Sequence, residues 1–128
     1  MKYLLDTHTA LWALGDKKKL SEVAACTIID PANEKHVSMV SAWELAIKIR
    51  IEKITFNGGV ERFFYKIDDS DLRLLPIRRA HIKTLETLPL LHRDPFDRLL
   101  ISTAIVGNLT LITADENIHK YDVPWIWQ

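Results

Sequence analysis

Four acidic residues stand at points where an apolar, strand-like segment gives way to a helix-like one. They are Asp6, Glu44, Asp97 and Asp115. The carboxyl ends of parallel strands lie along one edge of an α/β sheet, so acids that are distant in sequence can converge there. Clustered carboxylates repel one another unless a proton or a cation neutralises them, and an all-oxygen ligand set favours a hard ion such as Mg²⁺ or Mn²⁺. The pattern therefore predicts metal-assisted chemistry on a phosphate ester.

Each of these acids also has a purely structural explanation, as a helix cap or as a negative charge at a helix N-terminus. Ser41 and Glu44 have the spacing of a capping box, and Lys48 lies one turn beyond Glu44, within reach of an ion pair. Asp94 is the clearest cap, because Asp-Pro marks a helix start, and Asp97 lies one turn further on. The structural and the functional explanation both stay open for each residue. However, each of the three predicted strand ends nearest the centre of the sheet carries an acid, which favours one common site.

The elements that would position these acids can be read from the apolar pattern. Strands are predicted at residues 2–5, 36–40, 72–75, 109–113 and, at an edge, 124–127. Helices are predicted at 10–14, 21–30, 60–67, 78–88 and 97–106, with Gly107 suited to the C-cap of the last one. This alternation predicts an α/β fold, with a central, mostly parallel sheet of about five strands and helices on both faces. The length predicts a single domain spanning residues 1–128.

The composition narrows the class of protein. Seventeen basic and seventeen acidic residues give no net charge, which speaks against a passive nucleic-acid binder but not against an enzyme with a local basic rim. Cys26 has no disulfide partner within the chain and is expected to be buried. No segment is long enough to span a membrane, and Asp6 comes too early for a signal peptide. A cytoplasmic location is therefore expected.

Basic residues are concentrated between positions 73 and 98. Such charges usually form a solvated helix face, but they could also contact a nucleic-acid backbone. The candidate substrate contacts are Arg93, Arg98, Lys48 and Thr113. The histidines share no metal-ligand spacing, so solvated positions or positions at the edge of the core are favoured for His8, His81, His92 and His119.

Four segments together resemble the PIN-domain family, and specifically VapC-type toxin ribonucleases of type II toxin–antitoxin pairs. They are residues 3–8, 41–48, 92–101 and 111–115, and the resemblance runs nearly end to end. It implies a three-layer PIN-like fold and a Mg²⁺- or Mn²⁺-dependent endoribonuclease. It also implies a homodimer and a cognate antitoxin that occludes the site. The choice of RNA as substrate rests on this resemblance alone.

The resemblance carries the family's acidic quartet over to Asp6, Glu44, Asp97 and Asp115, with Asp94 as an additional possible ligand. Asp6 and Asp97 would bind the ion directly, while Glu44 and Asp115 would complete its shell or hold its waters. The ion would polarise the phosphoryl group and activate a water molecule for attack on phosphorus.

Other functions fit the sequence less well. An aspartyl phosphatase would need a second Asp two residues after Asp6, where His8 stands. A receiver domain would need an acceptor Asp directly after the strand at 36–40. The main alternative is a non-catalytic PIN-fold protein-interaction module. Hydrophobic residues at 60–67 and in the Trp-rich tail predict a homodimer, with a partner peptide along the acidic cleft.

Overall fold

The computed structural model describes all residues from Met1 to Gln128. Five strands form one sheet in the order β3-β2-β1-β4-β5, and every neighbouring pair is parallel. The strands are β1 (Lys2–Leu5), β2 (Glu34–Ser38), β3 (Arg73–Leu75), β4 (Thr110–Ile112) and β5 (Trp125–Ile126). The predicted α/β fold is confirmed, with a sheet that is parallel throughout.

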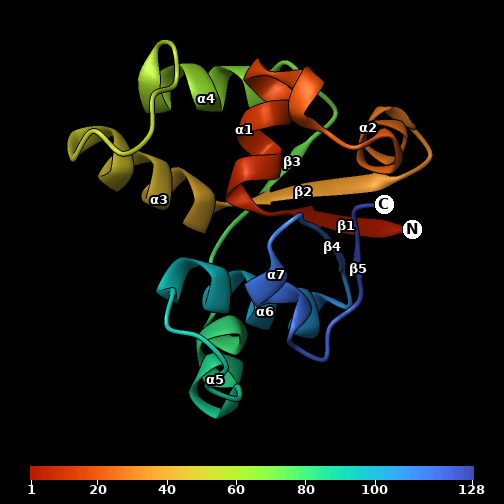
Figure 1. The fold of residues 1–128 in the computed structure, drawn as a ribbon, viewed down its shortest axis with the longest axis vertical. Coiled ribbons are helices and arrows are strands. Elements are labelled where there is room, and N and C mark those ends of the chain that lie inside the picture. Colours follow the sequence, from red (N-terminus) through yellow and green to blue (C-terminus); the bar gives the residue numbers. More distant parts are fainter.

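Helices cover both faces of this sheet, as Figure 1 shows: α1, α2 and α4 lie on one side, and α5, α6 and α7 lie on the other. The helices are α1 (Thr7–Gly15), α2 (Glu22–Ile29), α3 (Met39–Arg50), α4 (Gly59–Asp68), α5 (Arg79–Thr87), α6 (Pro95–Gly107) and α7 (Glu116–His119), with a short 3₁₀ turn at Lys17–Lys19. None of the helices is both long and apolar enough to cross a bilayer.

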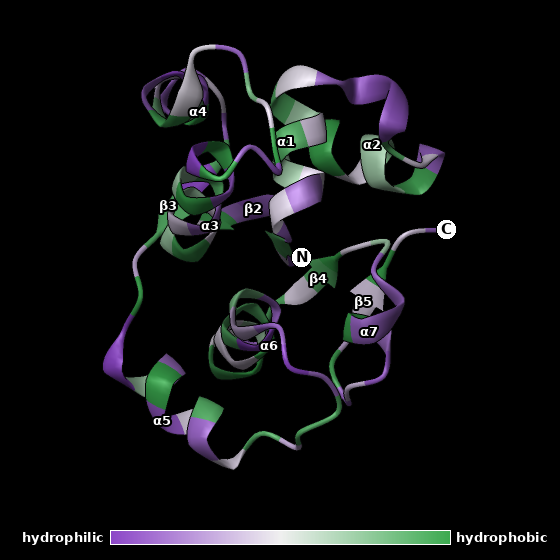
Figure 2. Cartoon of the chain, turned by 60° about the vertical axis from the view of Figure 1, so that its left-hand side comes forward, coloured by the Kyte–Doolittle hydropathy of each residue, from purple (hydrophilic) through white to green (hydrophobic).

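The central strand β1 is buried on both faces, which explains its unbroken apolar sequence. Leu5 packs in a core with Phe63 of α4. Leu4 points the other way and packs with Leu100 of α6. In Figure 2 α1 is largely hydrophobic, whereas the lysine-rich segment that connects it to α2 is hydrophilic. The sheet therefore separates two cores, one on each face.

The strand register brings the chain segments that carry the acids to one edge. Leu5 lies level with Val37 of β2 and with Ile112 of β4. The segments that follow these three strands therefore start at the same end of the sheet. Asp6 begins the first of these segments, and Thr113 begins the third.

The predicted start of α3 was wrong. The strand predicted at 36–40 is β2, which ends at Ser38, and the helix starts at Met39. The Ser38 hydroxyl accepts a hydrogen bond from the Val40 N–H at 3.0 Å and caps the helix. Ser41 lies inside the first turn, so Ser41 and Glu44 do not form a capping box. Val40 is apolar because it lies on the side of α3 that packs on the core, and Met39 lies on the exposed side of the same helix.

Three further details differ from the sequence predictions. Helix α6 includes Gly107, and its C-cap is Asn108, which has a left-handed φ of 53°. Cys26 is exposed, because it lies on the outer side of α2. Phe63 and Ile67 of α4 are buried within this chain. The hydrophobic face of α4, on which the predicted dimer partly rested, is therefore already covered.

Candidate active site

Asp6 is held at the junction between β1 and α1. Its Oδ1 accepts a hydrogen bond from the Thr9 N–H at 2.9 Å, which caps α1, and its Oδ2 accepts one from Thr113 Oγ1 at 2.6 Å. The residue is only 6% exposed. Burial raises the pKa of Asp6 even though the hydrogen bonds from Thr113 and Thr9 oppose that rise. Asp6 is thus a cap and also an acid whose charge is poorly solvated.

Glu44 enters the same region from the second turn of α3, where it is almost completely buried. Its Oε1 accepts a hydrogen bond from Thr7 Oγ1 at 2.5 Å, and its Oε2 forms an ion pair with Lys48. Thr7 donates its only hydroxyl hydrogen to Glu44, so the Ser41 hydroxyl 2.9 Å away must donate to Thr7. Partial burial lowers the pKa of Lys48, but its hydrogen bond to Glu44 and the neighbouring negative charges raise it overall.

Asp94 and Asp97 lie one turn apart at the start of α6. Asp94 is the N-cap, and its Oδ1 accepts hydrogen bonds from the N–H groups of Phe96, at 2.9 Å, and Asp97, at 3.2 Å. Asp97 has a different environment, since its only side-chain hydrogen bond joins Oδ2 to His92 Nε2 at 3.2 Å. The capping function of this pair therefore belongs to Asp94.

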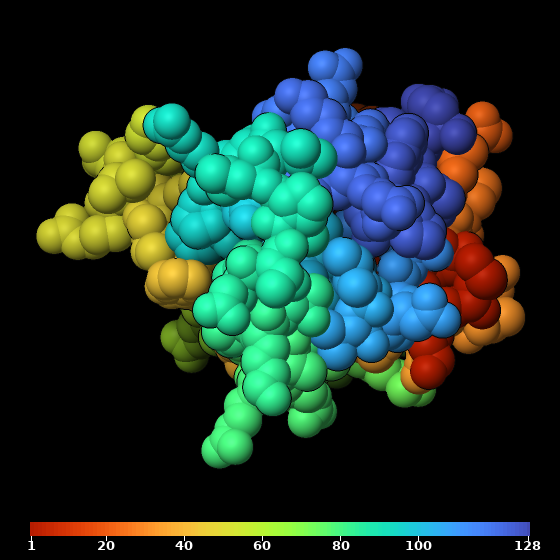
Figure 3. Space-filling view, turned by 90° about the horizontal axis from the view of Figure 1, so that it is seen from below, coloured from red at the N-terminus to blue at the C-terminus, as the bar shows by residue number.

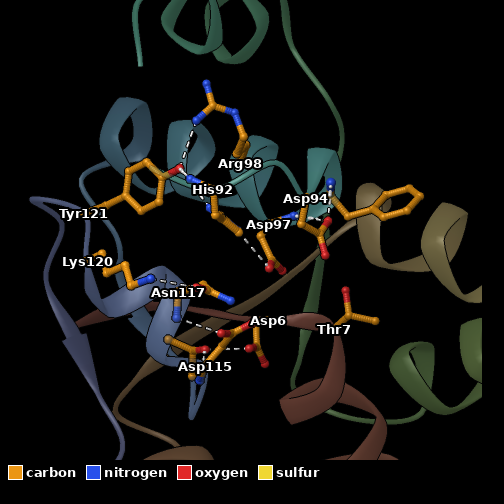
Figure 4. A network of polar contacts seen from close by, with 12 residues as sticks. Asp6, Thr7, His92, Asp94, Asp97, Arg98, Asp115, Asn117, Lys120 and Tyr121 are labelled. Atoms are coloured by element: carbon orange, nitrogen blue, oxygen red, sulfur yellow. Dashed lines mark hydrogen bonds and ion pairs between the residues drawn. The ribbon is translucent and has the colours of Figure 1, made fainter. Parts of the chain in front are cut away.

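Asp97 is the acid whose ionisation is most perturbed. Burial is the largest cause, and the charges of four other acids add to it, raising the pKa of Asp97 to about 8. These four acids are Asp94, Asp115, Asp6 and Glu44. Figure 4 shows the carboxyl groups of Asp97, Asp6 and Asp115 facing one another. Acids from α3 and from the starts of α1, α6 and α7 thus share one electrostatic environment.

Asp115 joins the group from the turn after β4. Its Oδ1 accepts a hydrogen bond from the Asn117 N–H at 2.8 Å and caps α7. The Thr113 hydroxyl accepts the Asp115 N–H at 3.0 Å while it donates to Asp6. Thr113 therefore connects two of the acids, Asp6 from the end of the neighbouring strand β1 and Asp115 two residues further along its own segment.

The donor set fits a hard divalent cation, because every side chain in it offers carboxylate oxygen and none offers sulfur. No group of three or more acidic, histidine or cysteine side chains is arranged to hold one ion by itself. Mg²⁺ usually keeps several waters and takes only one or two carboxylates directly. The arrangement therefore suits an ion that has few direct protein ligands and binds water at its other coordination positions.

The predicted substrate contacts lie in different environments. Arg93 is exposed, whereas Lys48 is paired with Glu44. Thr113 is fully buried. The Arg98 guanidinium donates to two backbone carbonyl oxygens and to the Tyr121 hydroxyl. Of these four side chains, only Arg93 has no hydrogen bond or ion pair with the rest of the chain.

Three residues that contact the acids or their partners had no role in the site predicted from the sequence, although His92 was expected to be solvated or at the edge of the core. Thr7 binds Glu44, His92 binds Asp97, and Tyr121 binds His92. Thr7 directly follows Asp6, and His92 precedes Asp97 by about one turn and a half. Their proximity to predicted site residues was the available signal. Nothing in the sequence distinguishes Tyr121, which comes from a distant segment.

A PIN domain model matches residues 3–124, and the chain therefore belongs to the PIN-domain family. Among curated proteins, it is similar to Ribonuclease VapC22 of Mycobacterium tuberculosis, with 31% identity over 122 residues, covering 94% of this chain and 92% of the relative.

Solved structures show the same fold. One is VapBC2 from Rickettsia felis bound to a promoter DNA fragment, with a TM-score of 0.73 and 21% identity over the whole of both chains. Another is VapBC-1 from nontypeable Haemophilus influenzae, with a TM-score of 0.68 and 16% identity, covering 98% of this chain and 97% of the other. These likenesses confirm the predicted PIN-like architecture.

Proposed function

We propose that this chain is a Mg²⁺- or Mn²⁺-dependent endoribonuclease and the toxin of a toxin–antitoxin pair, with residues 1–128 forming a single nuclease domain. The observation that carries the proposal is the convergence of five acids from four segments of the chain: burial, together with the charges of the other four acids, raises the pKa of Asp97 to about 8. A protein gains nothing in stability from such repulsion. The repulsion is useful when a cation is to be bound, since the cation relieves it.

Asp6 and Asp97 are the proposed direct ligands, and Asp94 is a possible additional one. Asp94 and Asp97 each keep one carboxylate oxygen without a hydrogen bond from the chain. Glu44 already forms an ion pair with Lys48, which suits a residue that orients a bound water rather than one that binds the ion directly, and Asp115 is assigned the same role. When bound, the ion would supply a nucleophilic water and charge stabilisation at phosphorus.

Substrate and partner follow from the relatives. The curated relative is called a ribonuclease, and several structural neighbours are toxin–antitoxin complexes. We therefore propose RNA as the substrate, a cognate antitoxin as the partner and the cytoplasm as the place of action. Exposed Arg93, together with Arg98, Lys48 and Thr113, remains the proposed set of substrate contacts. Arg98, Lys48 and Thr113 already have partners within the chain. They can contact the substrate only if its binding breaks or shares those hydrogen bonds and the ion pair of Lys48.

The homodimer is part of the same proposal, but on a different surface from the one first predicted. Four exposed hydrophobic side chains recur at every fourth position of α3 and its C-cap: Met39, Trp43, Ile47 and Ile51. This spacing places them along one side of the helix. We assign this α3 stripe to contact with a second copy of the chain.

The proposal is tested by incubating the purified protein with RNA in the presence of Mg²⁺, Mn²⁺ or a chelator. Cleavage should require the metal. It should fall by orders of magnitude in Asp6→Asn and Asp97→Asn, and much less in Asp94→Asn, in which Asn still caps α6. Undiminished cleavage in excess chelator would contradict the mechanism. Complete absence of metal-dependent cleavage would favour the alternative, a non-catalytic interaction module.

A further inference from the structure

His92 lies between Asp97 and Tyr121, in contact with both (Figure 4). Its Nδ1 is 2.8 Å from the Tyr121 hydroxyl oxygen, and its Nε2 is 3.2 Å from Asp97 Oδ2. The side chain of His92 is only 10% exposed. Tyr121 is buried in the core between the sheet and α6. The imidazole is therefore held on both sides by groups that do not move freely.

The Tyr121 hydroxyl has one hydrogen to donate and two positions at which it accepts. Two groups that can only donate already contact its oxygen: Arg98 Nη1 at 2.9 Å and the backbone N–H of His92 at 3.2 Å. The hydroxyl hydrogen is therefore left for His92 Nδ1. An Nδ1 that accepts a hydrogen bond carries no proton, so the neutral ring bears its proton on Nε2, directed at Asp97.

Arg98 is itself fixed, which makes the hydroxyl orientation specific. Its guanidinium donates to the carbonyl oxygens of Pro89, at 2.8 Å, and Leu88, at 3.2 Å. These carbonyls lie in the segment between α5 and α6. Figure 3 shows this part of the chain, from green to cyan, in the middle of one face of the molecule, beside the blue C-terminal residues. Arg98 thus joins the segment between α5 and α6 to the Tyr121 hydroxyl.

We propose that His92 is a positioning residue for Asp97, held in its Nε2–H tautomer by Tyr121 and Arg98. It donates to Oδ2 and leaves Oδ1 of Asp97 free for a divalent cation. This inference rests on the proposed function, because it assigns Asp97 as a metal ligand. His92 does not bind the ion, since its Nε2 is directed at the carboxylate and its Nδ1 at Tyr121.

The need for such a donor follows from the contrast between Asp97 and two of the other acids, Asp6 and Glu44. Asp6 accepts two hydrogen bonds and Glu44 has two partners, whereas the carboxylate of Asp97 has His92 alone. Asp97 also carries the repulsion of four neighbouring charges. Without His92, the carboxylate of Asp97 would have no hydrogen bond from the chain to fix its orientation. Partners that orient a metal ligand typically contribute about 10–100-fold to metal affinity or activity.

The tautomer can be measured directly by ¹⁵N NMR of the histidine rings in metal-free protein above neutral pH. The wild type should show His92 with a protonated Nε2 and an unprotonated Nδ1. Tyr121→Phe removes the donor to Nδ1 while keeping the buried ring, and should give a mixture of tautomers. A wild-type ring that is protonated at Nδ1, or a tautomer unchanged in Tyr121→Phe, would overturn the proposal.

Mn²⁺ binding, followed by electron paramagnetic resonance, tests the consequence for the site. His92→Ala should weaken binding by about 10–100-fold. His92→Gln, whose amide nitrogen can occupy the position of Nε2, should recover part of that loss. The matched control is Tyr65→Phe, which loses a hydroxyl group from an exposed position on α4 and should bind Mn²⁺ like the wild type. Unchanged binding in His92→Ala, or no recovery in His92→Gln, would overturn the positioning role.

RNA cleavage by the wild type distinguishes a failure of the proposed function from a failure of the role proposed for His92. A wild type that binds Mn²⁺ with the predicted tautomer and the predicted variant effects, yet cleaves no RNA, would refute the proposed function and leave the role of His92 intact. A wild type that cleaves RNA with Mn²⁺, while His92→Ala binds Mn²⁺ equally well, would refute the role of His92 and leave the proposed function intact.

Discussion

Replacing Asp97 with Asn should remove a pH dependence of stability from the metal-free protein. The folded-state pKa of Asp97 is about 8, against an ordinary value of 3.8. Between these values the folded protein holds a proton that the unfolded chain has lost. The free energy of unfolding must therefore fall as the pH rises through this interval, and then level off above about 8. An amide at position 97 does not titrate, so the share of this decline that comes from Asp97 should disappear, leaving only that of Asp6, whose pKa burial also raises.

The size of this fall in the free energy of unfolding can be bounded from the pKa shift of Asp97. One fully perturbed group changes the free energy of unfolding by about 1.4 kcal/mol for each pH unit, or roughly 4 kcal/mol over three units. The Asp97 side chain keeps 14% of its surface exposed, and its titration depends on the charges of the neighbouring acids. We therefore expect a decline of about 2 kcal/mol between pH values of roughly 5 and 8.

The assay is urea unfolding at several pH values with chelator present, on the wild type, Asp97→Asn and Asp94→Asn. Asp94→Asn is the matched control, because it keeps the cap and leaves Asp97 able to titrate. Asp97→Asn should be more stable than the wild type near pH 8, and Mn²⁺ should then stabilise the wild type but not the variant. The same decline in Asp97→Asn as in the wild type would refute the assignment of the perturbed acid to Asp97.

Three other predictions concern the surface and the scaffold. Lysine at both Ile47 and Ile51 should convert a dimer to a monomer in sedimentation, and a wild type that is monomeric at high micromolar concentration would contradict the α3 stripe. Lys35→Met should lower the free energy of unfolding by about 1–3 kcal/mol, because the buried ammonium group of Lys35 donates to two carbonyl oxygens at the end of α2 and to Asp71. An unchanged midpoint of urea unfolding would show that these hydrogen bonds do not stabilise the fold. Asn108→Ala should cost about 1 kcal/mol at its left-handed φ, whereas Asn108→Gly should be neutral or stabilising; equal thermal stability of the two variants would count against the cap.

The fold was predictable because its signals are local. Residues 2–5 are apolar throughout since β1 is buried on both faces, and the spacing of Phe63 and Ile67 marks the inner side of α4. The boundary at β2 was missed because both Ser38 and Ser41 are good caps. Which serine starts the helix depends on how α3 packs against the sheet, and the sequence does not specify that.

The site was predictable only in part. Asp6 and Asp97 follow recognisable strand-end and helix-start patterns, and the burial of Asp6 and the raised pKa of Asp97 support their selection. The link from Asp97 through His92 to Tyr121 joins residues 24 positions apart along the chain (97 to 121). No spacing rule predicts such a link, because it depends on how the C-terminal segment folds back over α6.

The central claim is that the converging acids form a divalent-metal site. The most direct measurement is a crystal structure of the Mn²⁺-soaked protein with anomalous diffraction data. The account predicts an anomalous peak bound by carboxylate oxygens of Asp6 and Asp97. The claim would be contradicted if no peak appeared there at a Mn²⁺ concentration that supports RNA cleavage, or if the ion were bound without Asp97.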